Sequence, residues 1–562
     1  MSIRARLPAV AVVACTLTFY LWTLSPSAGW ADALRLQLDA ALGGSTYWFL
    51  EDVDRTLGDG WPFQFLGVAA WDHPLYVMLA QLVVPLPIAN LAWRINAISA
   101  VAAAGAVTAL FVVGVKMTGD RRAAALAAAA LAVSHTFWFQ AVTAEVYAIH
   151  ALFMLLLIGF MLYGPEHVSL RVRFAIAVMA GLATANHGLF LLTIGTALAC
   201  SPRSVLRCGV RELTVVAGGF LLGFAPWWIQ FLRMWRIGGL FATMQGATGL
   251  PVLADRLWTP PGTGLMNVAG YVAWLTYQFT PFGVAMGLWG FVDLRRRSPA
   301  AFRLLLALFT VHVIFSANYQ VADRFTFHVF SYVVFALAMA AGFARLLVAI
   351  DTLAIGQRRL HIAAAAATVV AVLSPVALYA VTPHAVRAAG FNDAAVGIPP
   401  VGTGERDGIE YFMNPNHRGD DSAERFGRTA LAGLADDALV LVAKDSDQET
   451  YLVLRYFQLV ERLRPDVTLE LILWRPSMSM PAAILERVRA EAPCRPVYLA
   501  SLNSRSYPLH ALDEAFTIAS ESGLHRVRVA ASFQPAHQCG AVPGARPTRS
   551  VQSFVQEAMR TR

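Results

Sequence analysis

The sequence predicts a mainly α-helical protein, in which a polytopic membrane helix bundle of about eleven spans is followed by a soluble α/β domain. Of the 562 residues, 57% are hydrophobic and only 14% are charged, and the mean hydropathy is +0.54, outside the range of an ordinary soluble domain. Apolar runs recur up to about residue 382, and a polar region begins at residue 404. We therefore expect a membrane domain at 1–382, with its first outer loop at 25–93, and a soluble periplasmic domain at 383–562.

Polar clusters divide the membrane domain into segments close to the roughly 20 residues that a helix needs to span a bilayer. The expected helices are 7–24, 94–115, 122–141, 146–163, 171–185, 187–200, 213–232, 270–292, 303–316, 326–348 and 361–382. The first segment also fits a secretory signal cleaved after Ala31 or Ala33. An uncleaved span is favoured, because Leu7 to Leu24 is long for a signal core and many spans follow.

Two parts of this topology are less regular than the rest. The segment 73–89 contains Pro74, Pro85 and Pro87, which make it a poor full span, so we expect it to lie at the membrane interface. The helices 171–185 and 187–200 are short, and could together form one long or re-entrant element.

Basic residues give the orientation, because loops rich in Lys and Arg stay in the cytoplasm. Starting from Arg4 and Arg6 inside, the alternation of spans puts every later cluster on the same side: Lys116, Arg121 and Arg122; Arg171 and Arg173; Arg203, Arg207 and Arg211; Arg295, Arg296 and Arg297; Arg358 and Arg359. The net charge of +8 thus reflects topology rather than a nucleic-acid partner. The scheme predicts a multi-pass inner-membrane protein with a cytoplasmic N-terminus and a periplasmic C-terminal domain.

The same alternation collects the rare polar residues on the outer face. A glutamate at the centre of a membrane helix costs roughly 3 kcal/mol, so a chain that keeps Glu145 usually uses it. The outer-face residues are Asp32, Asp39, Glu51, Asp52, Asp54, Asp72 and His73 in the first loop, Glu145 and Tyr147, Asn186 and His187, and Asp323 and Arg324. Such a surface suits a general base that takes a proton from an alcohol, with Arg or His neutralising a phosphate leaving group.

Several stretches, in this order, resemble the protein O-mannosyltransferase-like membrane proteins of the GT-C glycosyltransferase class. They are "TLSPSAGWADALRLQ" (23–37), "LGVAAWDHPLY" (66–76), "AEVYAIH" (144–150), "GLATANHGL" (181–189) and "NYQVADRFTF" (318–327). The stretch 422–467 is similar to the outer domain of the bacterial members.

This resemblance implies a GT-C-like fold and transfer of a sugar, mannose or another hexose, from a polyprenyl-phosphate donor to an acceptor hydroxyl on the outer face. The family's general base, an acid in the first outer loop, maps onto Asp32. Members often carry a second acid three residues later, where this chain has Arg35, and Asp39 or Asp52 could take its place. The family's longer His-Pro-Pro-Gly-Tyr-Pro-Leu-Tyr run is reduced here to the residues 72–76.

The chemistry assigns a role to each outer-face residue. Asp32 would be the base, Glu145 and Asn186 would hold sugar or acceptor hydroxyls, and His187 or Arg324 would meet the phosphate. The other substrate-binding candidates are Asp39, Asp72, His73, Tyr147 and Asp323. No cofactor or metal is expected, since phosphate leaves readily and no metal-ligand spacing is present. The expected partners are membrane lipid, a lipid-linked sugar donor and a protein, lipid or glycan acceptor, but no nucleic acid.

The C-terminal region reads as alternating strands and helices. "DALVLVAKD", "DVTLELILW", "RPVYLAS" and "HRVRVAA" are candidate strands, and a helical run separates the first two, as in a partly parallel sheet. No Gly-rich phosphate loop or nucleophile elbow is present, so the domain is expected to bind the acceptor or to be a structural cap. Of the five cysteines, Cys494 and Cys539 both fall in this domain, where an oxidising compartment would allow a disulfide.

Two other functions stay open at this point. A transporter or flippase would use intramembrane acids to couple ions to substrate, but would favour acids deep in broken helices and an internal repeat, which the sequence lacks. A catalytically inactive membrane scaffold is kept open by Arg35.

Overall fold

The computed structural model describes residues 3–42, 73–164, 168–200, 209–238, 240, 244, 256–257, 262–321, 323–353, 357–395, 398, 401–402, 406–472 and 478–530. The chain forms two compact units, which are described separately. The helical unit comprises Met1–Pro26, Leu66–Ile398 and Ile409–Gly419, and the sheet unit comprises Ser27–Phe65, Pro399–Gly408 and Asp420–Arg562.

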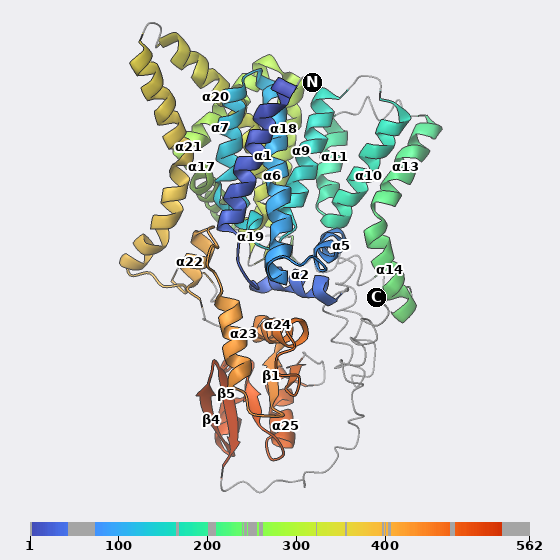
Figure 1. Ribbon diagram of the computed structural model, residues 1–562, viewed down its shortest axis with the longest axis vertical. Coiled ribbons are helices and arrows are strands. Elements are labelled where there is room, and N and C mark those ends of the chain that lie inside the picture. Colours follow the sequence, from blue (N-terminus) through green and yellow to red (C-terminus); the bar gives the residue numbers. More distant parts are fainter. Residues whose placement is uncertain are drawn as a thin grey trace. The chain divides into compact units, whose positions relative to one another are not determined.

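The helical unit contains a helix in every segment where the sequence predicts one (Figure 1). Its helices are α1 (Ile3–Thr23), α5 (Pro74–Val83), α6 (Leu91–Thr118), α7 (Arg121–Ala132), α8 (His135–Ala141), α9 (Tyr147–Tyr163), α10 (Leu170–Asn186), α11 (Phe190–Cys200), α13 (Val210–Gly223), α14 (Ala225–Gly238), α17 (Gly264–Arg297), α18 (Pro299–Asn318), α19 (Arg324–Phe327), α20 (Val329–Leu353), α21 (Arg358–Ala388) and α22 (Gly408–Met413).

Several of the expected spans are broken or short. The segment 122–141 is the pair α7 and α8, bent by 70°, and 213–232 is the pair α13 and α14, bent by 60°. By length and composition, four of the described helices could each cross a membrane, or six if each bent pair is one span. The chain is a multi-pass membrane protein, but the expected count of eleven spans is not confirmed. The pair α10 and α11 is interrupted at His187, whose backbone is extended.

The proline-rich segment after His73 forms α5, a helix of only 10 residues. At about 1.5 Å per residue it is about 15 Å long, half of a roughly 30 Å hydrocarbon core. Pro74 occupies the first turn, where its missing N–H costs nothing. The helix is therefore too short to cross the membrane by itself, in agreement with the prediction.

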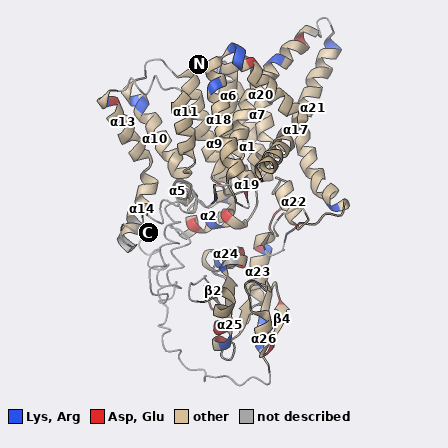
Figure 2. Ribbon diagram, turned by 180° about the vertical axis from the view of Figure 1, so that it is seen from behind, with Lys and Arg blue, Asp and Glu red and all other residues tan. Residues whose placement is uncertain are grey.

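Basic residues gather at one end of the helix bundle, the end at which the N-terminus lies (Figure 2). Lys116 is in the last turn of α6, α7 begins at Arg121, and Arg295 to Arg297 form the last turn of α17. The short helices α5 and α19 lie at the opposite end (Figure 1). This segregation of charge is the pattern that the alternating topology predicts for one membrane face.

The sheet unit is built on a five-stranded sheet in the order β2-β1-β3-β5-β4. The strands are β1 (Leu439–Ala443), β2 (Thr468–Ile472), β3 (Val497–Leu499), β4 (Phe516–Glu521) and β5 (Leu524–Val529), and the helices are α2 (Ala31–Leu42), α23 (Ser422–Gly433), α24 (Lys444–Val460), α25 (Met480–Glu491) and α26 (Leu509–Asp513). Strand β1 pairs in parallel with β2 and β3, and all five of its residues are buried, as a central parallel strand requires.

All four strand segments expected from the sequence are present, as β1, β2, β3 and β5. Strand β4 was not predicted. It forms a hairpin with β5 through Ser522 and Gly523, which both have positive φ, as a type I′ turn needs. Helix α2 was expected only as part of the first outer loop.

The described cysteines differ in their bonding. Cys494 is disulfide-bonded, whereas Cys15 and Cys200 are free thiols. Cys539 lies outside the described residues, so its pairing with Cys494 stays a prediction.

Candidate functional site

Hydrogen bonds join three turns of the helical unit that are far apart in the sequence. His73, just before α5, places its Nδ1 2.8 Å from the backbone oxygen of Asn186 at the end of α10. The fully buried Asn186 side chain in turn donates from Nδ2 to the backbone oxygen of Val146, at 3.0 Å. The turns at 73, 146 and 186 therefore meet at one place, as their shared side of the membrane predicted.

Glu145 belongs to the turn between α8 and α9, not to the middle of a helix. Ser99 of α6 holds its backbone from both sides: Ser99 Oγ accepts from the Glu145 N–H at 3.0 Å and donates to the Glu145 carbonyl at 2.9 Å. The Tyr76 hydroxyl of α5 lies 3.1 Å from the same Ser99 Oγ. The half-buried Glu145 side chain is thus presented by a fixed turn.

His73 and His187 stack, with ring centroids 5.2 Å apart and planes 20° apart. The hydrogen bonds assign the protons of the neutral rings. His73 Nδ1 faces a carbonyl and must donate, so its Nε2 is an acceptor; His187 Nδ1 accepts from the Leu189 N–H at 3.2 Å, so its Nε2 carries the hydrogen. The stacked pair therefore contains one acceptor nitrogen, His73 Nε2, and one donor nitrogen, His187 Nε2.

Tyr147 connects this cluster to a fourth turn. Its hydroxyl lies 3.2 Å from Thr326 Oγ, and its ring centroid lies 5.7 Å from that of His187. The Thr326 hydroxyl donates its one hydrogen to the carbonyl of Asp323 at 2.9 Å. The turns at 145–147, 186–187 and 323–326 are therefore joined to the turn at His73 by hydrogen bonds and ring contacts.

Arg324 is held by neutral groups. Its Nη1 donates to Asn267 Oδ1 at 2.8 Å and its Nη2 to Gln320 Oε1 at 2.6 Å. Among the described residues it forms no ion pair with a carboxylate. The half-buried guanidinium is therefore oriented without being neutralised, which suits the binding of an anion.

His150 is a member of the cluster that the prediction of site residues missed. Its ring is fully buried, lies 5.6 Å from His187 and packs on Phe330 at 3.9 Å between centroids. Within the described part of the chain, neither ring nitrogen has a hydrogen-bond partner. Its spacing of three residues from Tyr147, on the same face of α9, was the available signal.

Asp32, the expected base, belongs to the sheet unit, in the first turn of α2. Its Oδ1 lies 3.4 Å from Nη2 of Arg35, with 58% of the Asp32 side chain exposed against 10% for Arg35. Arg35, which stands where family members often carry a second acid, is thus a buried positive charge paired with the accessible carboxylate of Asp32. Asp39, further along α2, is buried, which does not suit the role of an alternative base.

A second acid does lie near Asp32, although no sequence motif predicted it. Helix α24 packs against α2, and Glu449 of α24 accepts a hydrogen bond from the Gly402 N–H at 3.2 Å. Burial raises the pKa of Glu449 above its usual value, and the neighbouring charge of Asp32 raises it further. Gly402 has φ +56°, and the Trp30 ring occupies the place of a Cβ. The start of α2 and Glu449 therefore share one closely packed environment.

Some expected site residues remain untested by geometry. Asp72 and Asp52 lie outside the described residues, and the two units are not placed relative to each other, so a common cavity of Asp32 and Glu145 stays a prediction. Within the described ranges, no group of three or more His, Cys, Asp or Glu could hold a metal ion.

Comparisons with known proteins bear on both the turns and the fold. Residues 72–201 match the family model described as "Protein O-mannosyl-transferase TMEM260 N-terminal domain". The fold is similar to that of ArnT from Cupriavidus metallidurans in the apo state, with a TM-score of 0.52 and 14% identity over 92% of this chain and 97% of that one. The structure of the same protein bound to undecaprenyl phosphate gives a TM-score of 0.51 and 13% identity over 95% and 99%. No protein with a curated description matches the chain.

The matched range contains His73, Glu145, Asn186 and His187, which meet in the turns described above. The resemblance to the protein O-mannosyltransferase-like membrane proteins of the GT-C class, which the sequence motifs predicted, is therefore confirmed by this match and by the ArnT fold.

Proposed function

We propose that this protein is a membrane glycosyltransferase that moves a sugar, mannose or another hexose, from a polyprenyl-phosphate donor to an acceptor hydroxyl on the outer face of the inner membrane. Two comparisons support the donor and the reaction class: the matched family is described as a protein O-mannosyl-transferase, and a structure of the same fold holds undecaprenyl phosphate. The acceptor class, protein, lipid or glycan, is left open by the proposal.

The observation that carries the proposal is the network of turns around Glu145, Asn186, His187 and Arg324. It combines a guanidinium that no described carboxylate neutralises with an imidazole whose Nε2 carries a hydrogen. Both groups can donate to the oxygens of a lipid-linked phosphate. In this proposal Glu145, on a turn that Ser99 fixes, contacts sugar hydroxyls, whereas the buried Asn186 positions the turns by its bond to Val146.

In the proposed reaction Asp32 takes the proton of the acceptor hydroxyl as the oxygen attacks the anomeric carbon. The bond between that carbon and the phosphate oxygen breaks, and polyprenyl phosphate leaves with the electron pair. Arg324 and His187 stabilise the charge that develops on the phosphate. Arg35, whose Nη2 lies 3.4 Å from Asp32 Oδ1, orients the carboxylate.

The test is transfer by the purified full-length protein in vesicles, with radiolabelled polyprenyl-phosphate mannose and polyprenyl-phosphate glucose as donors and a membrane extract as acceptor source. Asp32→Asn should lower transfer by at least about 100-fold, since it removes the proton acceptor and keeps the shape. Asp513→Asn, at an exposed acid of the sheet unit, is the matched control and should be fully active.

Full activity of the folded Asp32→Asn protein would overturn the assignment of the base. If the wild type transfers neither sugar but moves the labelled lipid across the vesicle membrane, the transporter reading replaces this one. If it does neither, the chain is an inactive scaffold.

A further inference from the structure

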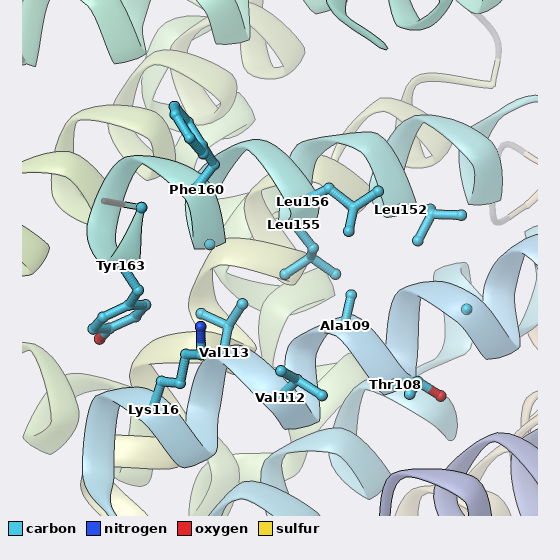
Figure 3. A pocket seen from close by; sticks show the side chains of 13 residues that line it. Thr108, Ala109, Val112, Val113, Lys116, Leu152, Leu155, Leu156, Phe160 and Tyr163 are labelled. Carbon is cyan, nitrogen blue, oxygen red and sulfur yellow. The ribbon is translucent and has the colours of Figure 1, made fainter. Parts of the chain in front are cut away.

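A groove of about 470 Å³ lies between α6 and α9 of the helical unit (Figure 3). Its walls are almost entirely apolar, with Ala109 and Val112 on α6 facing Leu155 and Leu156 on α9. Of the described residues that line it, Lys116 alone carries a charge. The volume falls within the roughly 300–1,000 Å³ of ligand pockets.

Small residues keep the groove open. Gly105 and Ala109 on α6 and Gly159 on α9 leave room where longer side chains would fill the space between the helices. A Cβ at Gly159 would lie 2.9 Å from Val113 Cγ2, so the Val113 side chain or the helix would have to shift to accommodate it. Val112 and Leu156 are exposed large apolar residues in this surface, which in a membrane faces lipid.

Lys116 gives the groove a charged end. It lies in the last turn of α6, at the end of the bundle where basic residues gather, and its Nζ is 5.9 Å from the centre of the Tyr163 ring (Figures 2 and 3). Nearby, Arg122 is neutralised by Asp351 at 2.9 Å. In the described part of the chain Lys116 has no such carboxylate partner, so its charge is available to an anion.

The length of the groove indicates the kind of lipid that fits. From Gly105 to Lys116 the helix rises about 16 Å, at about 1.5 Å per residue. One leaflet of a roughly 30 Å hydrocarbon core is about 15 Å deep. An acyl chain of an ordinary phospholipid, with its phosphate at the level of Lys116, matches this length, whereas a much longer polyprenyl chain does not.

We propose that the α6–α9 groove binds one anionic phospholipid from the leaflet at the basic end of the bundle, with an acyl chain along Ala109, Val112 and Leu156 and the headgroup phosphate on Lys116. Because an acyl chain is surrounded by apolar groups in the bilayer as well as in the groove, the headgroup must supply the selectivity. A basic residue between membrane helices is a recurring way to recognise such headgroups. This site is distinct from the turns proposed to bind the sugar donor, which involve α5 and α19.

The test is photo-crosslinking of the full-length protein in nanodiscs. A phosphatidylglycerol with a diazirine on its acyl chain should label peptides within 105–116 and 152–164, and the matching phosphatidylcholine should label them several-fold less. Lys116→Gln should remove the preference for phosphatidylglycerol, Lys116→Arg should keep it, and Ala109→Phe should reduce labelling by both lipids. Arg121→Gln, at the start of α7 and not among the residues that line the groove, is the control.

Three results would overturn the proposal: equal labelling by the two lipids, an unchanged preference in Lys116→Gln, or labelling confined to other peptides. Displacement of the label by undecaprenyl phosphate but not by unlabelled phosphatidylglycerol would assign the groove to a polyprenyl lipid instead. Lys116→Gln changes an exposed side chain in the last turn of α6, so it tests the headgroup contact even if Ala109→Phe fails to fold.

Discussion

At the residue scale, the replacement of an expected acid by Arg35 does not remove acidity from the neighbourhood of Asp32. Arg35 pairs with Asp32, and Glu449 approaches from a helix more than 400 residues later in the chain. Two carboxylates and one guanidinium then share the environment at the start of α2. Arg35 can therefore orient the accessible Asp32 carboxylate, while the nearby Glu449 contributes a second acid to the same environment.

The position of Glu449 predicts a specific pH dependence of stability. Because its folded pKa is raised above the ordinary 4.5, mainly by burial, the folded state binds the proton more tightly than the unfolded state. Its stabilising contribution is complete below 4.5 and is lost as pH rises through the folded pKa. The melting temperature of the wild type minus that of Glu449→Gln should therefore fall as pH increases above 4.5, since Gln can still accept from Gly402.

Thermal unfolding of the detergent-purified full chain between about pH 4 and pH 8 measures this difference. Glu514→Gln, at an exposed acid, should show a difference that does not change with pH. A pH-independent difference for Glu449→Gln as well would show that its carboxyl titrates normally.

At the scale of elements, the helices were predictable and their interruptions were only partly so. Apolar runs of the right length identify α6 and α20, because membrane helices must satisfy their backbone internally. The backbone of α17 leaves the helical conformation at Thr280, directly before Pro281. A residue before proline disfavours the helical conformation, so the sequence does indicate this break, although a hydropathy profile does not. The contacts of Glu449, by contrast, depend on how α24 packs against α2, which no local pattern encodes.

The turns around His73 depend on one buried amide, and this gives a test at the element scale. Asn186→Ala would remove the side-chain donor to the Val146 carbonyl, which keeps only the His150 N–H at 3.2 Å, and would untie the turn before α9 from α10, at a cost of about 0.5–1.5 kcal/mol. We expect a lower melting temperature together with weaker sugar transfer. Asn318→Ala, which loses only an amide bond to Ile314 within its own helix, should change neither appreciably. Loss of stability in Asn186→Ala with full transfer activity would separate these turns from the site.

At the scale of the whole molecule, the distribution of charge is the most informative feature of the sequence. The clusters of arginine and lysine that separate the apolar segments gather at one end of the helical unit, because successive helices reverse direction (Figure 2). The polar turns at 73, 145–147, 186–187 and 323–324 were predicted to share the other face by the same alternation, and their hydrogen bonds join them. The alternation of spans therefore predicted which turns lie close together, but not which of their atoms form hydrogen bonds.

The same alternation predicts the side on which the chain ends. Eleven spans that start from a cytoplasmic N-terminus leave the C-terminal region outside the cytoplasm, where the disulfide of Cys494 can form. Alkaline phosphatase, which is active only outside the cytoplasm, should be active when fused after Arg562 and inactive when fused after Asp120, between α6 and α7. Green fluorescent protein at the same two positions should show the reverse. Fluorescence at Arg562 with an inactive phosphatase would mean an even number of spans, and would put the sheet unit and Asp32 on the side opposite to the proposed reaction.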